Sequence, residues 1–71
     1  MDYDYSAEIA AAKGIIAREK QRLQKRGVKN DIYPCMVHEK DALYDYIKTE
    51  LGCSVSVFSS NDGGYVLKYS W

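Results

Sequence analysis

The fold is decided by residues 53–71, which read CSVSVFSSNDGGYVLKYSW. Two runs of alternating polar and apolar residues flank the turn-forming stretch 61–64, Asn-Asp-Gly-Gly, and this pattern is typical of a β-hairpin. A two-residue loop at Asp62 and Gly63 would mix serines with the large apolar side chains. A three-residue loop over 61–63, with Gly63 left-handed, separates the two faces, so we predict that loop.

This register assigns each hairpin residue to one of two faces. One face is mostly apolar and is expected to pack on the core; it holds Cys53, Val55, Val57, Tyr65, Leu67, Tyr69 and Trp71. The other is mostly polar and is expected to face water; it holds Ser54, Ser56, Phe58, Val66, Lys68 and Ser70. Phe58 and Val66 are the exceptions on the wet face, where they could form an apolar contact patch or a simple cross-strand pair.

Two amphipathic helices precede the hairpin. Residues 7–26 show helical spacing, with Ile9, Ala12, Ile16 and Leu23 on one face, Ser6 as the expected N-cap and Gly27 after the end. Gly14 interrupts this helix and is read as a close packing contact. Residues 39–51 repeat Leu43, Ile47 and Leu51 every four positions, and Gly52 closes them.

The linker between the helices contains a short stretch, residues 32–37, that could add an edge strand. Pro34 lacks an N–H and excludes a central strand there. The predicted order is therefore α-(β)-α-β-β, an α+β domain with two helices packed on a small antiparallel sheet. Its 71 residues form one domain, in which residues 1–5 are expected to be loose unless Tyr3 and Tyr5 dock.

Ten basic and ten acidic residues cancel to a net charge of zero, but residues 13–29 alone carry +6. Within that segment, Arg18, Arg22, Lys25 and Lys29 recur at helical spacing opposite the apolar face. Such a row suits contacts to successive phosphates, clamps for carboxylates on a protein partner, or simply a solvated helix face.

Catalytic and metal sites find little support in this chain. Cys35, His38 and Cys53 supply too few well-spaced ligands for a closed zinc site, and no oxyanion turn stands beside Cys35. A Cys35–Cys53 disulfide is conceivable, but without an export signal we expect reduced thiols in the cytoplasm. We expect no enzyme activity, no cofactor, no metal and no membrane span.

These observations predict a non-catalytic interaction module that binds a larger protein as adaptor or inhibitor, or that associates with itself as a homodimer. Its surfaces would be the basic helix face (Arg18, Arg22, Lys25, Lys29) and the outer face of the hairpin (Phe58, Val66, Lys68). The alternative is a nucleic-acid-binding protein that uses the basic helix face. The neutral total and the lack of a helix-turn-helix spacing count against this alternative.

Overall fold

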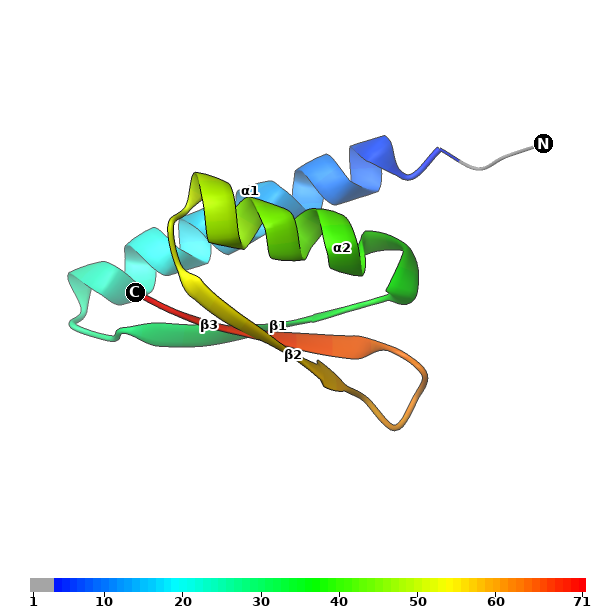
Figure 1. Ribbon diagram of the computed structural model, residues 1–71. Coiled ribbons are helices and arrows are strands. Elements are labelled where there is room, and N and C mark those ends of the chain that lie inside the picture. Colours follow the sequence, from blue (N-terminus) through cyan, green and yellow to red (C-terminus); the bar gives the residue numbers. More distant parts are fainter. Residues whose placement is uncertain (1–3) are drawn as a thin grey trace.

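A three-stranded antiparallel sheet carries the helices on one of its faces in the computed structural model, which describes residues 4–71 (Figure 1). The elements follow one another as α1 (Ser6–Lys25), β1 (Asn30–Cys35), α2 (Val37–Asp45), a π-helical turn η1 (Tyr46–Glu50), β2 (Ser54–Ser59) and β3 (Tyr65–Ser70). This arrangement confirms the α+β class and the predicted order of elements.

The stretch around Pro34 is a strand and pairs with the end of the chain. β1 runs antiparallel to β3, with Tyr33 opposite Leu67 and Cys35 opposite Tyr65. Since β3 also pairs with β2, the strand order is β1-β3-β2, and β1 and β2 are the two edges. Pro34 therefore sits on an edge strand, where a missing N–H costs no bond within the sheet.

The hairpin turn has the predicted three-residue loop. The Ser60 N–H donates to the Gly64 carbonyl at 2.9 Å, and Gly63 has a φ of +86°. Asp62 rigidifies the loop because its Oδ1 accepts hydrogen bonds from the Ser60 hydroxyl at 2.6 Å and from the Gly64 N–H at 3.1 Å. The hydrogen bond from the Ser60 hydroxyl, and to a lesser extent the one from the Gly64 N–H, holds the pKa of the Asp62 carboxyl below its ordinary value.

The long helix α1 begins and ends one residue earlier than predicted. Ser6 is its first helical residue and not its cap, since the Asp4 carboxylate accepts the Ser6 N–H at 2.9 Å. At the other end the Val28 N–H donates to the Leu23 carbonyl and the Gly27 N–H to that of Gln24, which is a Schellman motif with Gly27 at φ +81°. Gly14 makes no close packing contact, because nothing lies within 4 Å of the position a Cβ would take.

The second helix begins two residues earlier than predicted and ends in a π-helical turn. The Glu39 carboxylate reaches back to the Met36 N–H at 3.1 Å, which is half of a capping box. In η1 the Leu51 N–H donates to the Tyr46 carbonyl five residues back, at 3.2 Å. The Thr49 hydroxyl, at 2.7 Å from the Asp45 carbonyl, bonds to the backbone in the same turn.

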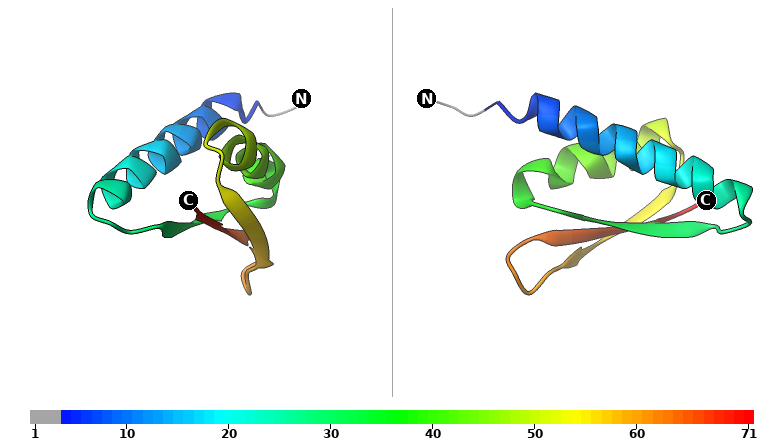
Figure 2. Two further views of the ribbon diagram at one scale, coloured as in Figure 1. Left: turned by 60° about the vertical axis from the view of Figure 1, so that its left-hand side comes forward. Right: turned by 180° about the vertical axis from the view of Figure 1, so that it is seen from behind.

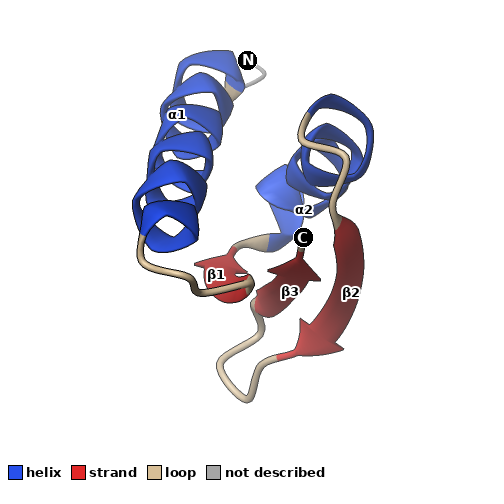
Figure 3. Ribbon diagram, turned by 90° about the vertical axis from the view of Figure 1, so that its left-hand side faces the viewer, coloured by secondary structure: helices blue, strands red, loops and turns tan. Residues whose placement is uncertain are grey.

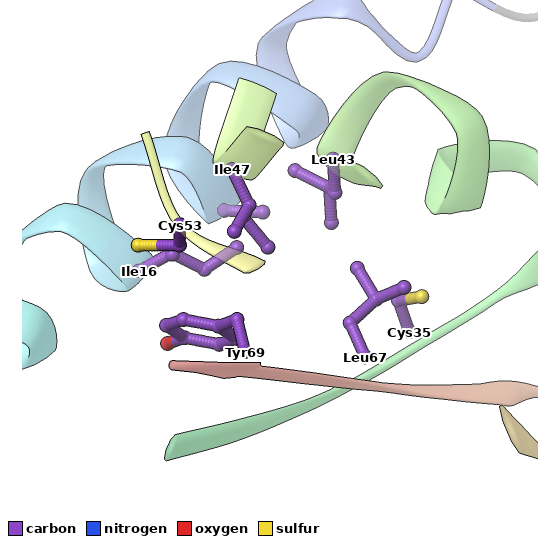
Figure 4. Close-up of a cluster of buried hydrophobic side chains, with 8 residues drawn as sticks. Ile16, Cys35, Leu43, Ile47, Cys53, Leu67 and Tyr69 are labelled. Carbon is purple, nitrogen blue, oxygen red and sulfur yellow. The ribbon is translucent and has the colours of Figure 1, made fainter. Parts of the chain in front are cut away.

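The core lies between the helices and the inner face of the sheet. Ile16, Leu43 and Ile47 descend from the helices onto Leu67 and Tyr69, and all five are fully buried (Figure 4). α1 lies above β1, and α2 lies above the other two strands (Figures 2 and 3). Of the helices in residues 4–71, none has the length and apolar character needed to cross a membrane.

Candidate functional site

The face of the sheet that points away from the helices is open in the described part of the chain (Figure 1). Cross-strand register places Pro34, Val66 and Phe58 in one row over all three strands. The neighbouring row is Ile32, Lys68 and Ser56.

We call this surface the outer face and define it by Ile32, Pro34, Phe58, Val66 and Lys68. The structure thus brings together Phe58, Val66 and Lys68, the three hairpin residues selected from the sequence. Phe58 is 53% exposed and Ile32 58% exposed. Ile32 and Pro34 were missed, since they join this face only through the pairing of β1 with β3. Residues 30–35, Asn-Asp-Ile-Tyr-Pro-Cys, show no polar–apolar alternation that could have found them in the sequence.

The four basic residues selected from the sequence are all exposed, as predicted, but they form a shorter row. Arg18, Arg22 and Lys25 are exposed on the helix, whereas Lys29 lies beyond its end because the chain turns at Gly27. The Arg22 guanidinium binds Glu19 with a 2.7 Å Nη2–Oε2 contact. This hydrogen bond raises the pKa of Arg22 and lowers that of Glu19. Arg22 is therefore less available to a partner than its neighbours.

Four lysines lie over aromatic rings and so belong to the margin of the core. The pairs, with ammonium-to-centroid distances of 4.7 to 5.8 Å, are Lys13 over Tyr46, Lys20 over Trp71, Lys40 over Tyr65 and Lys48 over Tyr44. Such lysines cover apolar surface with their stems while the rings attract the charge. Lys13 and Lys20 come from the +6 segment, so the charge that this segment offers to a ligand is smaller than its composition indicates.

His38 joins the first turns of the two helices. Its Nε2 lies 3.3 Å from Oε1 of Glu8, and its ring stacks on Tyr5 with centroids 3.9 Å apart. Buried Glu39 completes a group of one imidazole and two carboxylates whose ligand atoms lie within 4.8 Å of one another. These three residues could hold a metal ion, but Glu39 already caps α2, and both carboxylates sit at helix starts that favour negative charge. The contacts of His38 with Glu8 and Tyr5 therefore hold the start of α2 against the start of α1.

The two cysteines lie at opposite ends of the sheet (Figure 4). Cys35 is opposite Tyr65, whereas Cys53 directly precedes Ser54, which is opposite Ser70. Both thiols are free and buried, and burial raises the pKa of each. Neither a Cys35–Cys53 disulfide nor a zinc site that combines both cysteines with His38 is assembled by this fold.

One shallow pocket opens between the end of β1, the start of α2 and the hairpin turn. Its volume is about 150 Å3, and its lining is formed by Pro34, Cys35, Met36, Glu39, Ser60, Asp62, Gly64 and Tyr65. Sites for small organic ligands usually measure about 300 to 1,000 Å3. The pocket is therefore small for a substrate, and the larger surfaces are the stronger candidates for function.

Comparisons with profiles of protein families, with curated proteins and with solved structures found no match to this chain.

Proposed function

We propose that this protein is a non-catalytic interaction module that binds a larger protein as adaptor or inhibitor, or that associates with itself. The observation that carries the proposal is the row of exposed Pro34, partly buried Val66 and exposed Phe58 across the outer face. A contiguous apolar patch with a polar border is the usual mark of a protein contact surface. Serines and Lys68 supply that border here.

The size of the pocket supports the same proposal. A site for chemistry needs a concave place where a nucleophile or base meets a substrate. In the described residues, both buried thiols have a raised pKa, which disfavours the reactive thiolate. His38 is occupied by Glu8 and Tyr5.

The test is affinity capture from an extract of the source cells with three matched forms of the protein. We expect the wild type to retain a partner that Phe58→Ser loses and that Ile15→Ser keeps. Ile15 is the control because it is an apolar side chain with comparable exposure, 44%, on α1. Retention of the same partner by Phe58→Ser would remove the outer face from the proposal.

The second candidate function is nucleic-acid binding through α1. It is favoured by exposed cations in the C-terminal half of α1 and just beyond it, Arg18, Lys25, Arg26 and Lys29, none of which forms an ion pair within residues 4–71. Lys25, in the last turn, also complements the helix dipole, which accounts for that cation without a ligand.

Salt dependence separates the two candidates. Anisotropy of labelled duplex DNA and single-stranded RNA is measured at about 50 and 200 mM salt, the range over which phosphate contacts weaken by orders of magnitude. If α1 binds nucleic acid, Arg18→Ala with Lys25→Ala abolishes the signal and Phe58→Ser leaves it unchanged. The reverse result, or no binding at low salt, would exclude this candidate.

A further inference from the structure

The two edges of the sheet differ in how far their backbone groups are available. Antiparallel ladders bond at alternate residues, so one bond of known direction assigns the others. The Trp71 N–H donates to the Lys29 carbonyl at 2.9 Å, which turns the backbone groups of Asn30, Ile32 and Pro34 to the free edge of β1. On the other side, the bond from Ser60 to Gly64 turns those of Val55, Val57 and Ser59 to the free edge of β2.

The edge of β1 is protected against pairing. Pro34 has no N–H, and the Ile32 N–H is already bound by Oδ1 of Asp31 at 2.8 Å. Two of the three outward positions on β1 therefore offer no donor to another strand. Proline and inward-turned charge are common means of protecting a sheet edge.

The edge of β2 lacks this protection. Residues 53–60 contain no proline and no charged residue. The outward N–H groups of Val55, Val57 and Ser59 donate no hydrogen bond within residues 4–71. No helix of the described chain runs beside this edge (Figure 3). An uncharged, β-branched, unguarded edge strand is a template for a further strand.

We propose that the free edge of β2 pairs antiparallel with β2 of a second copy, which joins the two sheets into one. The proposal names the partner in the self-association part of the proposed function and rests on that part. Two observations select a second copy as the occupant: β2 brings no charge to repel its own duplicate, and the whole chain is neutral.

The register of the pair follows from the faces of β2. Residues directly opposite each other in an antiparallel pair share a face, and the outward backbone groups must meet. Centring the two-fold axis on Val57 satisfies both conditions over the greatest length, with Val55 opposite Ser59 of the other copy and about six ladder hydrogen bonds. Ser56 then lies opposite Phe58 of the other copy, and the two Phe58 residues become diagonal neighbours with Cα atoms about 7–8 Å apart.

This geometry also ends the assembly at two copies. The outermost strands of the joined sheet are the two β1 strands, whose edges are blocked by Pro34 and by the Asp31–Ile32 hydrogen bond. A two-fold contact of identical surfaces is closed, so it does not propagate into a fibre.

The test measures molar mass by light scattering or sedimentation from about 10 μM to about 1 mM protein. We expect the wild type to approach twice the 8.1 kDa of one chain as concentration rises. Val57→Lys and Val57→Glu should each raise the dissociation constant at least about tenfold, because like charges then meet on the two-fold axis. An equimolar mixture of the two variants should restore the dimer. Val57 is 38% exposed, so circular dichroism should show both variants folded.

A cross-link gives an independent readout of the same register. Residues of a hydrogen-bonded antiparallel pair have Cα atoms about 5.5 Å apart, which suits a disulfide. Val57→Cys should therefore oxidise to a covalent dimer, whereas Ile32→Cys on the other edge should not. Cys35 and Cys53 are buried and provide little background.

Three results would overturn the proposal. The first is a monomeric wild type at 1 mM, and the second is a dimer that Val57→Lys leaves intact. The third is a dimer lost with Ile32→Ser but not with Val57→Lys, since it would place self-association on the outer face. If the dimer proposal fails in one of these ways, capture of a different protein that Phe58→Ser abolishes would still support the proposed function. The two proposals can therefore fail separately.

Discussion

The buried hydroxyl of Tyr69 donates a hydrogen bond to Oδ2 of Asp31, 3.1 Å away across the β1–β3 pair. Oδ1 of the same carboxylate accepts the Ile32 N–H. One side chain thus satisfies the polar end of a core tyrosine and occupies an amide on the edge of the sheet. Because both roles meet at Asp31, its replacement should affect stability and association together.

Replacement of Asp31 by alanine should lower the free energy of unfolding by about 1–3 kcal/mol, the usual cost of leaving a buried donor without its partner. Urea unfolding measures the change. In the double variant with Tyr69→Phe the donor is also gone, so the combined loss should be smaller than the sum of the single losses. Strict additivity would show that the hydrogen bond contributes nothing to stability.

Alkaline pH should destabilise the protein through Tyr69. Burial, together with the charge and hydrogen bond of Asp31, raises the pKa of Tyr69 well above its ordinary value. Above about pH 10 the unfolded chain releases this proton while the folded chain retains it. The contribution of Tyr69 to the free energy of unfolding is therefore fully present below about pH 10 and is lost as pH rises further. Urea midpoints measured from about pH 8 to 11 should fall more steeply for the wild type than for Tyr69→Phe. Parallel curves would contradict the assignment.

Two glycine substitutions should have opposite effects. Gly63→Ala forces a side chain into the left-handed conformation of the hairpin turn and should destabilise by about 1–2 kcal/mol. Gly14→Ala lies in the exposed middle of α1, where nothing obstructs a Cβ, and should stabilise by about 0.5–1 kcal/mol. Thermal melts compare both with the wild type. A destabilised Gly14→Ala would point to a contact that the fold does not show.

Phe58→Ser should be nearly neutral for stability, which qualifies it as a variant for binding experiments. Phe58 is half exposed on the outer face, so we expect a change below about 1 kcal/mol. Leu67→Ala, by contrast, removes a fully buried core side chain and should cost about 2–5 kcal/mol. Denaturant titration distinguishes the two. A large loss with Phe58→Ser would mean that this ring stabilises the chain itself.

Both cysteines should react only when the protein opens. They are buried, and their raised pKa values disfavour the thiolate that attacks thiol reagents. Labelling at about pH 8 should be slower in the native protein than in urea by at least about 10³, the low end of folding equilibria for small domains. Rapid labelling of either thiol in the native state would contradict its burial.

The hairpin and the helices could be predicted because their signals are local. Gly63 after Asn61 and Asp62 specifies the loop, and the loop specifies which side of the sheet receives Leu67. The candidate surfaces were only partly predictable. Arg18 and Lys25 follow from helical spacing alone, but Ile32 joins Phe58 only when a strand pairs over more than thirty residues of chain. The same holds for the contact of His38 with Glu8, thirty residues away.

By itself, the sequence determined the two helices, the hairpin, its loop and the inner and outer sides of the two hairpin strands, since periods of 3.6 and 2 and a few glycines act over one or two turns of chain. Only the tertiary structure decided that β1 pairs with β3, that Asp31 and Pro34 thereby guard one edge, and that the edge of β2 stays open. Those outcomes depend on which distant segments pair, and pairing is set by the closure of long loops and by packing against the whole core, which no local pattern encodes.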